Sequence, residues 1–297
     1  MPEGDTVWRT ARRLDEALAG AVLTRAELRW PTLAAAELSG ARTIEIRSRG
    51  KHLLHRLDSG LTLHSHLRMD GQWRIEATAA LTARRLADDD LRAVLGTATW
   101  TALGLRLGML DLVPSSQEHV LVGHLGPDVL GEDWDPVRAT DNLARATGTV
   151  GAALLDQRTL AGVGTMYAAE SLFLERLPPW SAPADLARPT IGALVDRVHR
   201  LLDTGRQRAV PSTTGSTRRA ETTYVHGRSG QACRRCGTLV RVATIGAAPH
   251  DRAMFYCPGC QGGLGPTDEG RPQRPLGLRA GGPPPQTSPG RGRRAPG

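Results

Sequence analysis

Four cysteines fall in one window of the sequence, as two Cys-x2-Cys pairs separated by twenty residues. They are Cys233, Cys236, Cys257 and Cys260. Two such pairs bring four thiolates within tetrahedral reach, which is the requirement of structural Zn²⁺. Two disulfides are the competing arrangement, which a reducing cytoplasm disfavours, and a redox motif needs only one pair. The spacing therefore predicts one structural zinc ion with no open coordination position.

The residues between the two cysteine pairs predict a short β-hairpin. Thr238–Ile245 alternates as a strand does, residues 246–249 form a turn, and Arg252–Tyr256 returns to the second pair. So short a hairpin cannot stand alone, so zinc binding, worth about 10–16 kcal/mol, would hold it together. On this hairpin, Arg241 and Arg252 are available to contact phosphate or a groove.

The start of the chain offers a nucleophile. Removal of Met1, usual before a small second residue, exposes the secondary amine of Pro2. An α-amino group titrates near about 7.7–8.0, so part of it is unprotonated at neutral pH and can attack a sugar C1′ to form a Schiff base. Glu3 lies beside it and could protonate the sugar ring oxygen or shuttle protons. Taken alone, Pro-Glu after Met is common and usually carries no such meaning.

Composition singles out one basic residue. The chain has 38 Lys and Arg, of which only Lys51 is a lysine. Either one lysine survived by chance, or this position needs a compact ammonium that guanidinium cannot imitate. The net charge of +8 and the pI of about 10.3 suggest a polyanionic partner. Because about half of that excess lies beyond residue 260, charge alone supports nucleic-acid binding only moderately.

Hydrophobic periodicity predicts a β-rich first half and a helical second half. A helix is expected over Asp5–Ala19. Strands are expected over Val22–Leu28, Thr43–Arg47, His52–Leu57, Leu61–His66, Gln72–Glu76, Ala98–Leu103 and Leu105–Val113. Helices are expected over Val137–Ala146, Gly151–Asp156, Val163–Arg176 and Ile191–Asp203. The fold class is therefore α+β, an N-terminal β-sandwich with a flanking helix followed by a helical domain and the cysteine hairpin.

Four units follow from this pattern: a sandwich over 1–130, helices and a polar, mobile loop over 131–222, the finger over 223–261, and a tail over 262–297. The tail is rich in Pro, Gly and Arg and is expected to be disordered. The chain has no run of about 20 apolar residues and no signal-peptide pattern at its start, so a cytoplasmic protein is expected.

Together these residues resemble the formamidopyrimidine-DNA glycosylase and endonuclease VIII family, from Met1 to about Gln261. The resemblance is carried by four separated motifs in order: Met1–Gly4, which looks like the endonuclease VIII side of the family; Ser48–Leu53, which holds Lys51; Asp156–Gly164, with Glu170 beyond it; and His250–Cys257. The second resembles the family's turn with its catalytic-site lysine, which settles the case for Lys51. The third resembles its helix–two-turn–helix, and the fourth the second strand of its zinc finger.

The resemblance implies a base-excision-repair enzyme that is both a DNA glycosylase and a lyase at abasic sites. Pro2 would be the nucleophile, Glu3 the acid/base, and Lys51 a phosphate ligand that assists chemistry at the ribose. The strand would be cut by β- and δ-elimination. Further residues expected to contact DNA are Met69, a wedge that fills the hole left by the flipped base, Gln157, Gly164, Thr165 and Arg252. His64 and His66 are interpreted as strand residues, not as metal ligands. The partner would be duplex DNA with oxidised bases or abasic sites, bound by a monomer associated with the nucleoid.

The chain departs from the family pattern at three places. Thr165 stands where the family usually has Asn. Asp5-Thr6 stands where Pro-Glu is frequent. The Pro-Arg-Arg-Phe-Gly run of the purine-directed branch is absent, so either Leu105 or Arg106 could supply a second wedge. This absence and the Glu-Gly opening favour oxidised pyrimidines over 8-oxoguanine.

Two other functions remain open at this point. One is a catalytically weak or inactive zinc-finger protein that recognises damaged DNA, which Thr165 leaves possible. The other is a protein- or RNA-interaction module made of the finger and the Arg-rich tail. Steep salt dependence of DNA binding would separate either DNA-binding reading from a protein-binding one.

Overall fold

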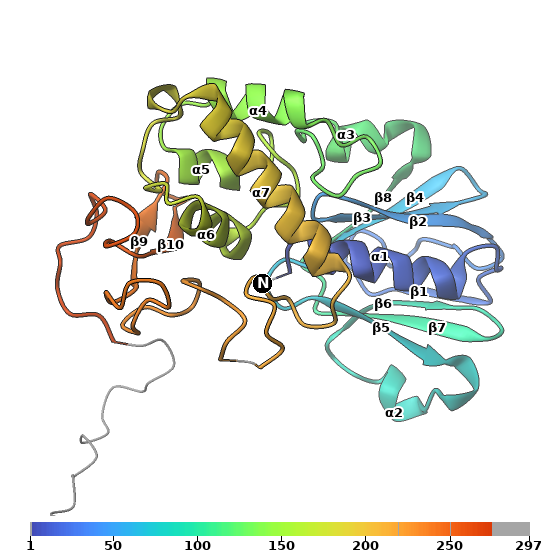
Figure 1. Cartoon of the computed structure of the whole chain (residues 1–297). Helices are drawn as coiled ribbons and strands as arrows, with labels where there is room; N and C mark the ends of the chain where they lie inside the picture. Colours follow the sequence, from blue (N-terminus) through green and yellow to red (C-terminus); the bar gives the residue numbers. More distant parts are fainter. Residues whose placement is uncertain (1, 219, 250, 275–297) are drawn as a thin grey trace, which may run out of the picture.

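Two four-stranded antiparallel sheets face each other in the first part of the chain (Figure 1). The computed structural model describes residues 2–274 except Arg219 and His250; Met1 and residues 275–297 also lie outside the description. One sheet has the strand order β1-β6-β7-β5 and the other β2-β3-β4-β8. The strands are β1 (Arg25–Leu28), β2 (Thr43–Arg49), β3 (His52–Leu57), β4 (Leu61–His66), β5 (Gln72–Ala77), β6 (Leu91–Gly96), β7 (Trp100–Leu105) and β8 (Met109–Pro114).

The first helix closes the core between the two sheets. Helix α1 (Gly4–Leu18) buries Val7, Ala11, Leu14 and Leu18, which share one face because they recur every three or four residues. These side chains join a single apolar cluster with residues of both sheets, such as Ile46 and Leu95. Gly20, at φ 76°, allows the turn that follows the helix. The start of the chain is thereby tied to the sandwich.

The second half of the chain is helical. Its main helices are α4 (Pro136–Arg145), α5 (Val150–Leu155), α6 (Thr165–Leu174) and α7 (Arg188–Arg206), with the short η3 (Pro183–Asp185) before α7. Four other short helical segments belong to the first part of the chain: η1 (Thr78–Ala80) and α2 (Ala83–Leu86) between β5 and β6, and η2 (Ser115–Gln117) and α3 (Glu118–Val122) after β8. Asp135 caps α4 by accepting hydrogen bonds from the N–H groups of Val137 and Arg138, and Pro136, whose fixed φ suits a helix start, occupies the first helical position. No helix within residues 2–274 has the length and apolar character needed to cross a membrane.

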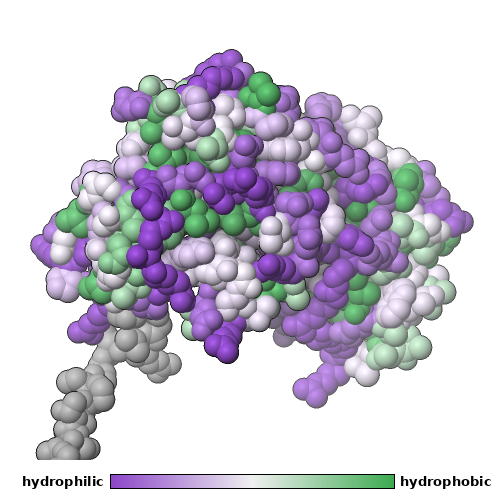
Figure 2. Space-filling model, viewed as in Figure 1, coloured by the Kyte–Doolittle hydropathy of each residue, from purple (hydrophilic) through white to green (hydrophobic). Residues whose placement is uncertain are grey.

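The cysteine hairpin packs on the helical half. Strands β9 (Arg241–Ile245) and β10 (Arg252–Tyr256) pair antiparallel, and Ile245, Met254 and Phe255 share a core with the helices. Figure 1 places the hairpin at one end of the molecule and the sandwich at the other, with the start of the chain between them. The same face in Figure 2 is mixed in character, with hydrophobic residues scattered among hydrophilic ones.

The structure differs from the sequence prediction at several elements. Strand β6 was not predicted, and the predicted strand Leu105–Val113 is interrupted by a turn at residues 106–108 before β8. Helix α1 begins at Gly4, one residue before the predicted start at Asp5, with Glu3 at the cap position. Predicted disorder from residue 262 onward does not hold for Gly262–Arg274, which pack on the finger; the rest of the predicted disordered tail, 275–297, lies outside the described residues.

Candidate active site and nucleic-acid interface

The first residues of the chain are fastened to the start of helix α6. The Glu3 carboxylate accepts hydrogen bonds from the N–H groups of Gly164 (2.8 Å), Met166 (2.8 Å) and Tyr167 (3.3 Å). These N–H groups are at or next to a helix N-terminus, where unpaired donors and the helix dipole favour an anion. Glu3 is buried, and the half-buried Pro2 precedes it directly. The acid predicted to act beside the Pro2 amine is thus held in one position by three donors from a distant part of the sequence.

Two close approaches explain why glycines flank this contact. The N–H of Gly4 donates to the carbonyl of Gly162 at 2.9 Å, and a Cβ on Gly4 would lie 3.0 Å from the Gly162 Cα. A Cβ on Gly164 would lie 2.6 Å from Glu3 Oε1. The chain start can pack against the Leu160–Gly164 turn because Gly4 and Gly164 have no side chains. A Cβ on Gly4 would crowd the Gly162 backbone, and one on Gly164 would crowd the Glu3 side chain.

Lys51 lies in the tight turn that joins β2 to β3. Gly50 adopts φ 57°, and its N–H donates to Asp128 Oδ2 at 2.8 Å. Asp128 is buried and also accepts from the N–H of Leu130 at 3.1 Å. The turn that carries Lys51 is therefore anchored by a carboxylate from the connection between the two halves. Sequence reasoning missed Asp128; its only signal was the turn-forming Gly126-Pro127-Asp128.

Glu3 and Lys51 are electrostatically coupled. Burial raises the pKa of the Glu3 carboxyl, while the Lys51 ammonium and the N–H groups of Met166 and Tyr167 oppose that rise. Burial lowers the pKa of Lys51; Glu3 opposes this shift, and the nearby Arg252 adds to it. Each shift keeps the group closer to neutrality than it is in water, which suits proton transfer near neutral pH. The structure thus gathers Pro2 and Glu3, Lys51, and Arg252 from three separate segments into one neighbourhood.

The predicted helix–two-turn–helix is present, and Gln157 stabilises its turns. Its amide N–H group donates to the carbonyls of Leu155 (3.0 Å) and Val163 (2.9 Å), and its oxygen accepts from the N–H of Gly162 (3.0 Å). Those bonds use both amide hydrogens inside the protein. Thr165 is the first residue of α6 and is half-buried. The predicted contacts of Gln157, Gly164 and Thr165 with DNA stay predictions.

Two neighbouring turns carry the candidate wedges. Met69 lies between β4 and β5, and 63% of its surface is exposed. Leu105, the last residue of β7, is buried, whereas Arg106 in the turn that follows is exposed. The Arg68 side chain packs over Gly108, which brings the two turns together. Of the two residues left open by the sequence, only Arg106 faces outward.

His64 and His66 are strand residues of β4, as predicted, and they belong to a histidine cluster beside Lys51. His52 Nδ1 lies 2.8 Å from His64 Nε2, and His64 Nδ1 lies 2.9 Å from Asp111 Oδ2. Burial lowers the pKa of His52 to about 3 and that of His66 to about 4. At neutral pH these two rings are therefore neutral and add no charge to the site.

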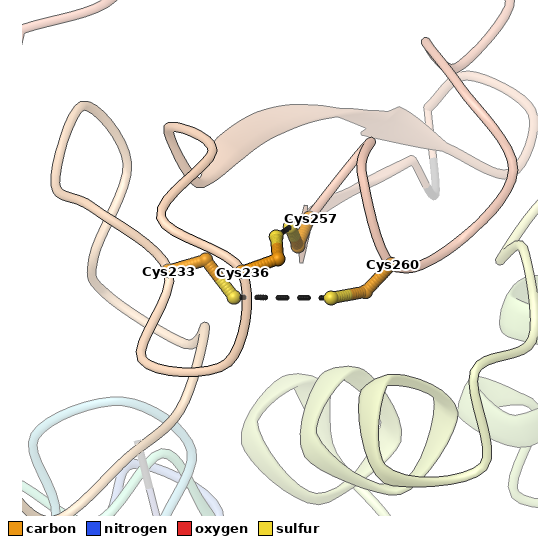
Figure 3. Close-up of side chains that lie close together, drawn as sticks. All are labelled: Cys233, Cys236, Cys257 and Cys260. Atoms are coloured by element: carbon orange, nitrogen blue, oxygen red, sulfur yellow. Dashed lines mark hydrogen bonds between the residues drawn. The ribbon is translucent and has the colours of Figure 1, made fainter.

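The four cysteines come together as the spacing predicts. Their sulfur atoms all lie within 4.8 Å of one another, with Cys236 and Cys257 3.4 Å apart and Cys233 and Cys260 4.0 Å apart (Figure 3). These distances exceed the S–S bond of about 2.05 Å. They suit a tetrahedral metal with M–S bonds of about 2.3 Å, which places sulfurs about 3.8 Å apart. The four thiols therefore form a site that can hold one metal ion.

Arg241 does not serve as predicted. Its guanidinium donates two hydrogen bonds to the carboxylate of Asp268 and is 11% exposed, while Asp268 is 2% exposed. Asp268 lies in the segment predicted to be disordered, so this partner was not expected from the residue pattern. Arg252, on the other strand, is exposed, and it lies near enough to Lys51 for its positive charge to help lower the pKa of Lys51.

Comparison with known proteins identifies the class. The family model described as the formamidopyrimidine-DNA glycosylase N-terminal domain matches residues 1–103, and the formamidopyrimidine-DNA glycosylase H2TH domain matches residues 125–218. The chain therefore belongs to the formamidopyrimidine-DNA glycosylase family.

Individual relatives include proteins named as endonuclease 8 and as formamidopyrimidine-DNA glycosylase. A probable endonuclease 8 2 of Streptomyces coelicolor is 47% identical over 272 residues, covering 91% of this chain and 98% of the relative. The DNA-(apurinic or apyrimidinic site) lyase Nei2 of Mycolicibacterium smegmatis is 43% identical and covers 88% of this chain and 99% of the relative. Among solved structures, a Lactococcus lactis formamidopyrimidine-DNA glycosylase bound to DNA with an abasic site superposes with a TM-score of 0.73 at 25% identity. That match covers 88% of this chain and 99% of the other.

Proposed function

We propose that this protein is a bifunctional DNA glycosylase and abasic-site lyase of base-excision repair, acting on oxidised bases. The observation that carries the proposal is the position of the chain start. There, Glu3 is held by three N–H donors, and the Lys51 ammonium is near enough to lower the pKa of the Glu3 carboxyl. This arrangement holds an N-terminal amine beside a proton donor and a cation. A protein that only binds damaged DNA has no need of it.

The chemistry begins at the Pro2 nitrogen. Once Met1 is removed, the lone pair of that nitrogen attacks C1′ of the flipped nucleotide, and the C1′–base bond breaks with its electrons leaving on the base. The nitrogen then loses its own proton, which the departing base takes up, and Glu3 delivers a proton to the ring oxygen, so the sugar opens and the nitrogen is left in a positively charged iminium. The iminium accepts electron density when a proton leaves C2′, which expels the 3′ phosphate; loss of the C4′ proton then expels the 5′ phosphate.

The residues around this centre position the DNA. Lys51 would bind the phosphate next to the lesion, Arg252 would contact the phosphates that flank it, and the start of α6 with Thr165 would hold a further phosphate. Extruding the base costs a few kcal/mol, and the exposed Met69 would fill the gap it leaves. Arg106 would accompany it from the neighbouring turn.

We further propose that the four cysteines hold one structural Zn²⁺. The support is the donor set itself, four thiols within 4.8 Å of one another and no further ligand among the described residues. All elements named above come from one chain, so we propose a monomer that works at chromosomal DNA in the cytoplasm.

Oxidised pyrimidines are the proposed substrates. The absence of the purine branch's Pro-Arg-Arg-Phe-Gly run and the Glu-Gly opening support this choice. The test is single-turnover cleavage of matched duplexes that carry either an oxidised pyrimidine or 8-oxoguanine, with an abasic-site duplex as the reference for lyase activity. We expect faster base release from the pyrimidine and product ends that carry phosphate on both sides of the gap. Preference for 8-oxoguanine would refute the substrate assignment, and loss of all cleavage would refute the enzymatic one.

A further inference from the structure

A segment beyond the zinc site binds back onto the outer edge of the finger. This C-terminal strap, Gly262–Arg274, runs along the side of β9 that does not face β10 (Figure 1). Val242 donates its N–H to Gln273 Oε1 and accepts from Gln273 Nε2, both at 2.8 Å. Two residues further along, the Thr244 carbonyl accepts from Thr267 Oγ1 at 2.9 Å. The strap therefore satisfies outward-facing groups of β9 that an edge strand otherwise leaves unpaired.

A buried polar cluster secures the strap at the base of the hairpin. Asp268 receives two hydrogen bonds from Arg241, and the Tyr256 hydroxyl donates to Asp268 Oδ2 at 2.7 Å. Tyr256 Oη in turn accepts from the N–H of Gly265 at 3.0 Å. The side chain of Asp268 is 2% exposed, so its charge is balanced by the arginine and by hydrogen bonds instead of by water. Arg241 and Tyr256 are paired residues of the two strands, so one carboxylate fixes both strands at once.

The two strands are paired along their whole length, so holding the hairpin at Arg241 and Tyr256 also holds its other end. Arg252 pairs with Ile245, and its neighbour Ala253 pairs with Thr244, the residue that the strap contacts. At that end, Arg252 lies near enough to Lys51 for the two positive charges to repel each other. The angle at which the hairpin leaves the cysteine site therefore decides where the Arg252 guanidinium stands relative to the active site.

We propose that Asp268 is a positioning residue for DNA binding, which acts through Arg241 and Tyr256 to hold the hairpin so that Arg252 faces the DNA backbone beside Lys51. This inference rests on the proposed function, in which Arg252 grips the phosphates that flank the lesion. It assigns a role to a segment that lies beyond both family domains matched in the chain.

The chain supplies a matched control next to the residue of interest. Asp268→Asn and Glu269→Gln each remove one negative charge from the strap, so both change the long-range attraction for DNA equally. Glu269 is 71% exposed, and within the part of the chain that the structure describes its ion-pair partner is Arg271, itself 85% exposed. Simple electrostatics predicts that both substitutions leave DNA binding unchanged or tighten it. The positioning role predicts that Asp268→Asn weakens it.

The measurement is the affinity of full-length, zinc-loaded protein for a duplex with a tetrahydrofuran abasic-site analogue, which binds without reacting. We expect about tenfold weaker binding for Asp268→Asn, the size of one lost charge-assisted hydrogen bond, and no loss for Glu269→Gln. Arg252→Ala should weaken binding about as much, and adding Asp268→Asn to it should cause no further loss, because linked residues are not additive. Zinc content is measured in every variant.

Three results would overturn the inference. The first is equal affinity of Asp268→Asn and Glu269→Gln, and the second is a double variant whose loss is the product of the single ones. The third is wild-type affinity of Arg252→Ala, which would also refute the proposed contact of Arg252 with the phosphates that flank the lesion. The enzymatic proposal is tested separately, by strand cleavage with the wild-type protein. If Asp268→Asn loses zinc or fails to fold, Gln273→Ala, which removes only the pairing with Val242, takes its place in the same cycle.

Discussion

Gly164→Ala tests whether the fastening of Glu3 is needed for catalysis. Residue 164 has φ −126°, an ordinary value for alanine, so backbone strain does not enter. The added Cβ would lie 2.6 Å from Glu3 Oε1 and 2.7 Å from its Cγ, closer than real carbon contacts allow. The Glu3 carboxylate must therefore move, and it loses hydrogen bonds from the start of α6.

Two effects of different size follow. Forcing a methyl group into a filled site costs about 1–3 kcal/mol of folding stability, and each kcal/mol lowers the melting temperature of a protein of this size by about 2–4 °C. The catalytic effect is larger, because a displacement of about 1 Å in a reacting group can cost about 100-fold in rate. We expect Gly164→Ala to fold, to bind abasic-site DNA, and to form the covalent intermediate about 100-fold more slowly.

The assay is the single-turnover rate of borohydride trapping on an abasic-site duplex at 25 °C, far below melting. Gly192→Ala is the matched control, since a Cβ there meets nothing within 4 Å in the middle of α7; it should trap at the wild-type rate. Wild-type trapping by Gly164→Ala would refute the argument that the precise position of Glu3 matters.

Three further predictions follow from the site. Arg252→Ala should lower the slope of log affinity against log salt by about 1 relative to wild type, whereas Arg271→Ala, exposed and paired with Glu269, should lower it less; equal slopes for all three proteins would contradict the phosphate contact. Burial lowers the pKa of Lys51 below the usual value of 10.5, so its ammonium is lost as pH rises through the lowered pKa, at a lower pH than for an ordinary lysine, and DNA affinity should fall in that window. Lys51→Arg should abolish this alkaline limb, because guanidinium keeps its charge, and an unchanged limb would assign the titration to another group. The purified protein should contain one zinc per chain by mass spectrometry, and Cys236→Ser or a strong chelator should remove it and weaken DNA binding at least tenfold; full affinity without metal would contradict a structural zinc.

Residue type and local spacing made the reactive groups predictable. Two Cys-x2-Cys pairs predict a tetrahedral thiolate site whatever the fold around them, and the sulfurs do converge. A single lysine among arginines, in a Ser-Arg-Gly-Lys turn, pointed to Lys51. Helix α1 was predicted nearly to the residue because its apolar positions repeat at the helical period.

Features that depend on distant partners were not predictable in this way. Nothing near Glu3 in the sequence announces that its partners are the N–H groups of Gly164, Met166 and Tyr167. Glu170, noted only for its place on the second helix, is buried and accepts from the N–H groups of Tyr224, Val225 and His226, which fixes the end of the loop before the finger.

Composition misled at the C-terminal strap. Gly262–Arg274 is polar and rich in Gly and Pro, which indicates disorder when the segment is considered alone. It is ordered by the free edge of β9 and by Arg241, neither of which is visible from the strap's own sequence. For the same reason Arg241 was expected to be available for a phosphate or a groove, whereas its partner is Asp268. Strand β6 was missed because three aspartates directly precede it.

The central claim is that the amine of Pro2 performs the chemistry. The most direct test is borohydride trapping of the purified protein on duplex DNA with an abasic site, comparing wild type, Pro2→Gly, and a variant with one extra residue before Pro2. Mass analysis of the wild-type N-terminus is run in parallel, and we expect it to show a chain that begins at Pro2. We predict a covalent adduct with wild type and with Pro2→Gly, which keeps an N-terminal amine, and none with the extended chain. An adduct of undiminished yield from the extended chain, or no adduct from wild type that binds the DNA tightly, would contradict the account.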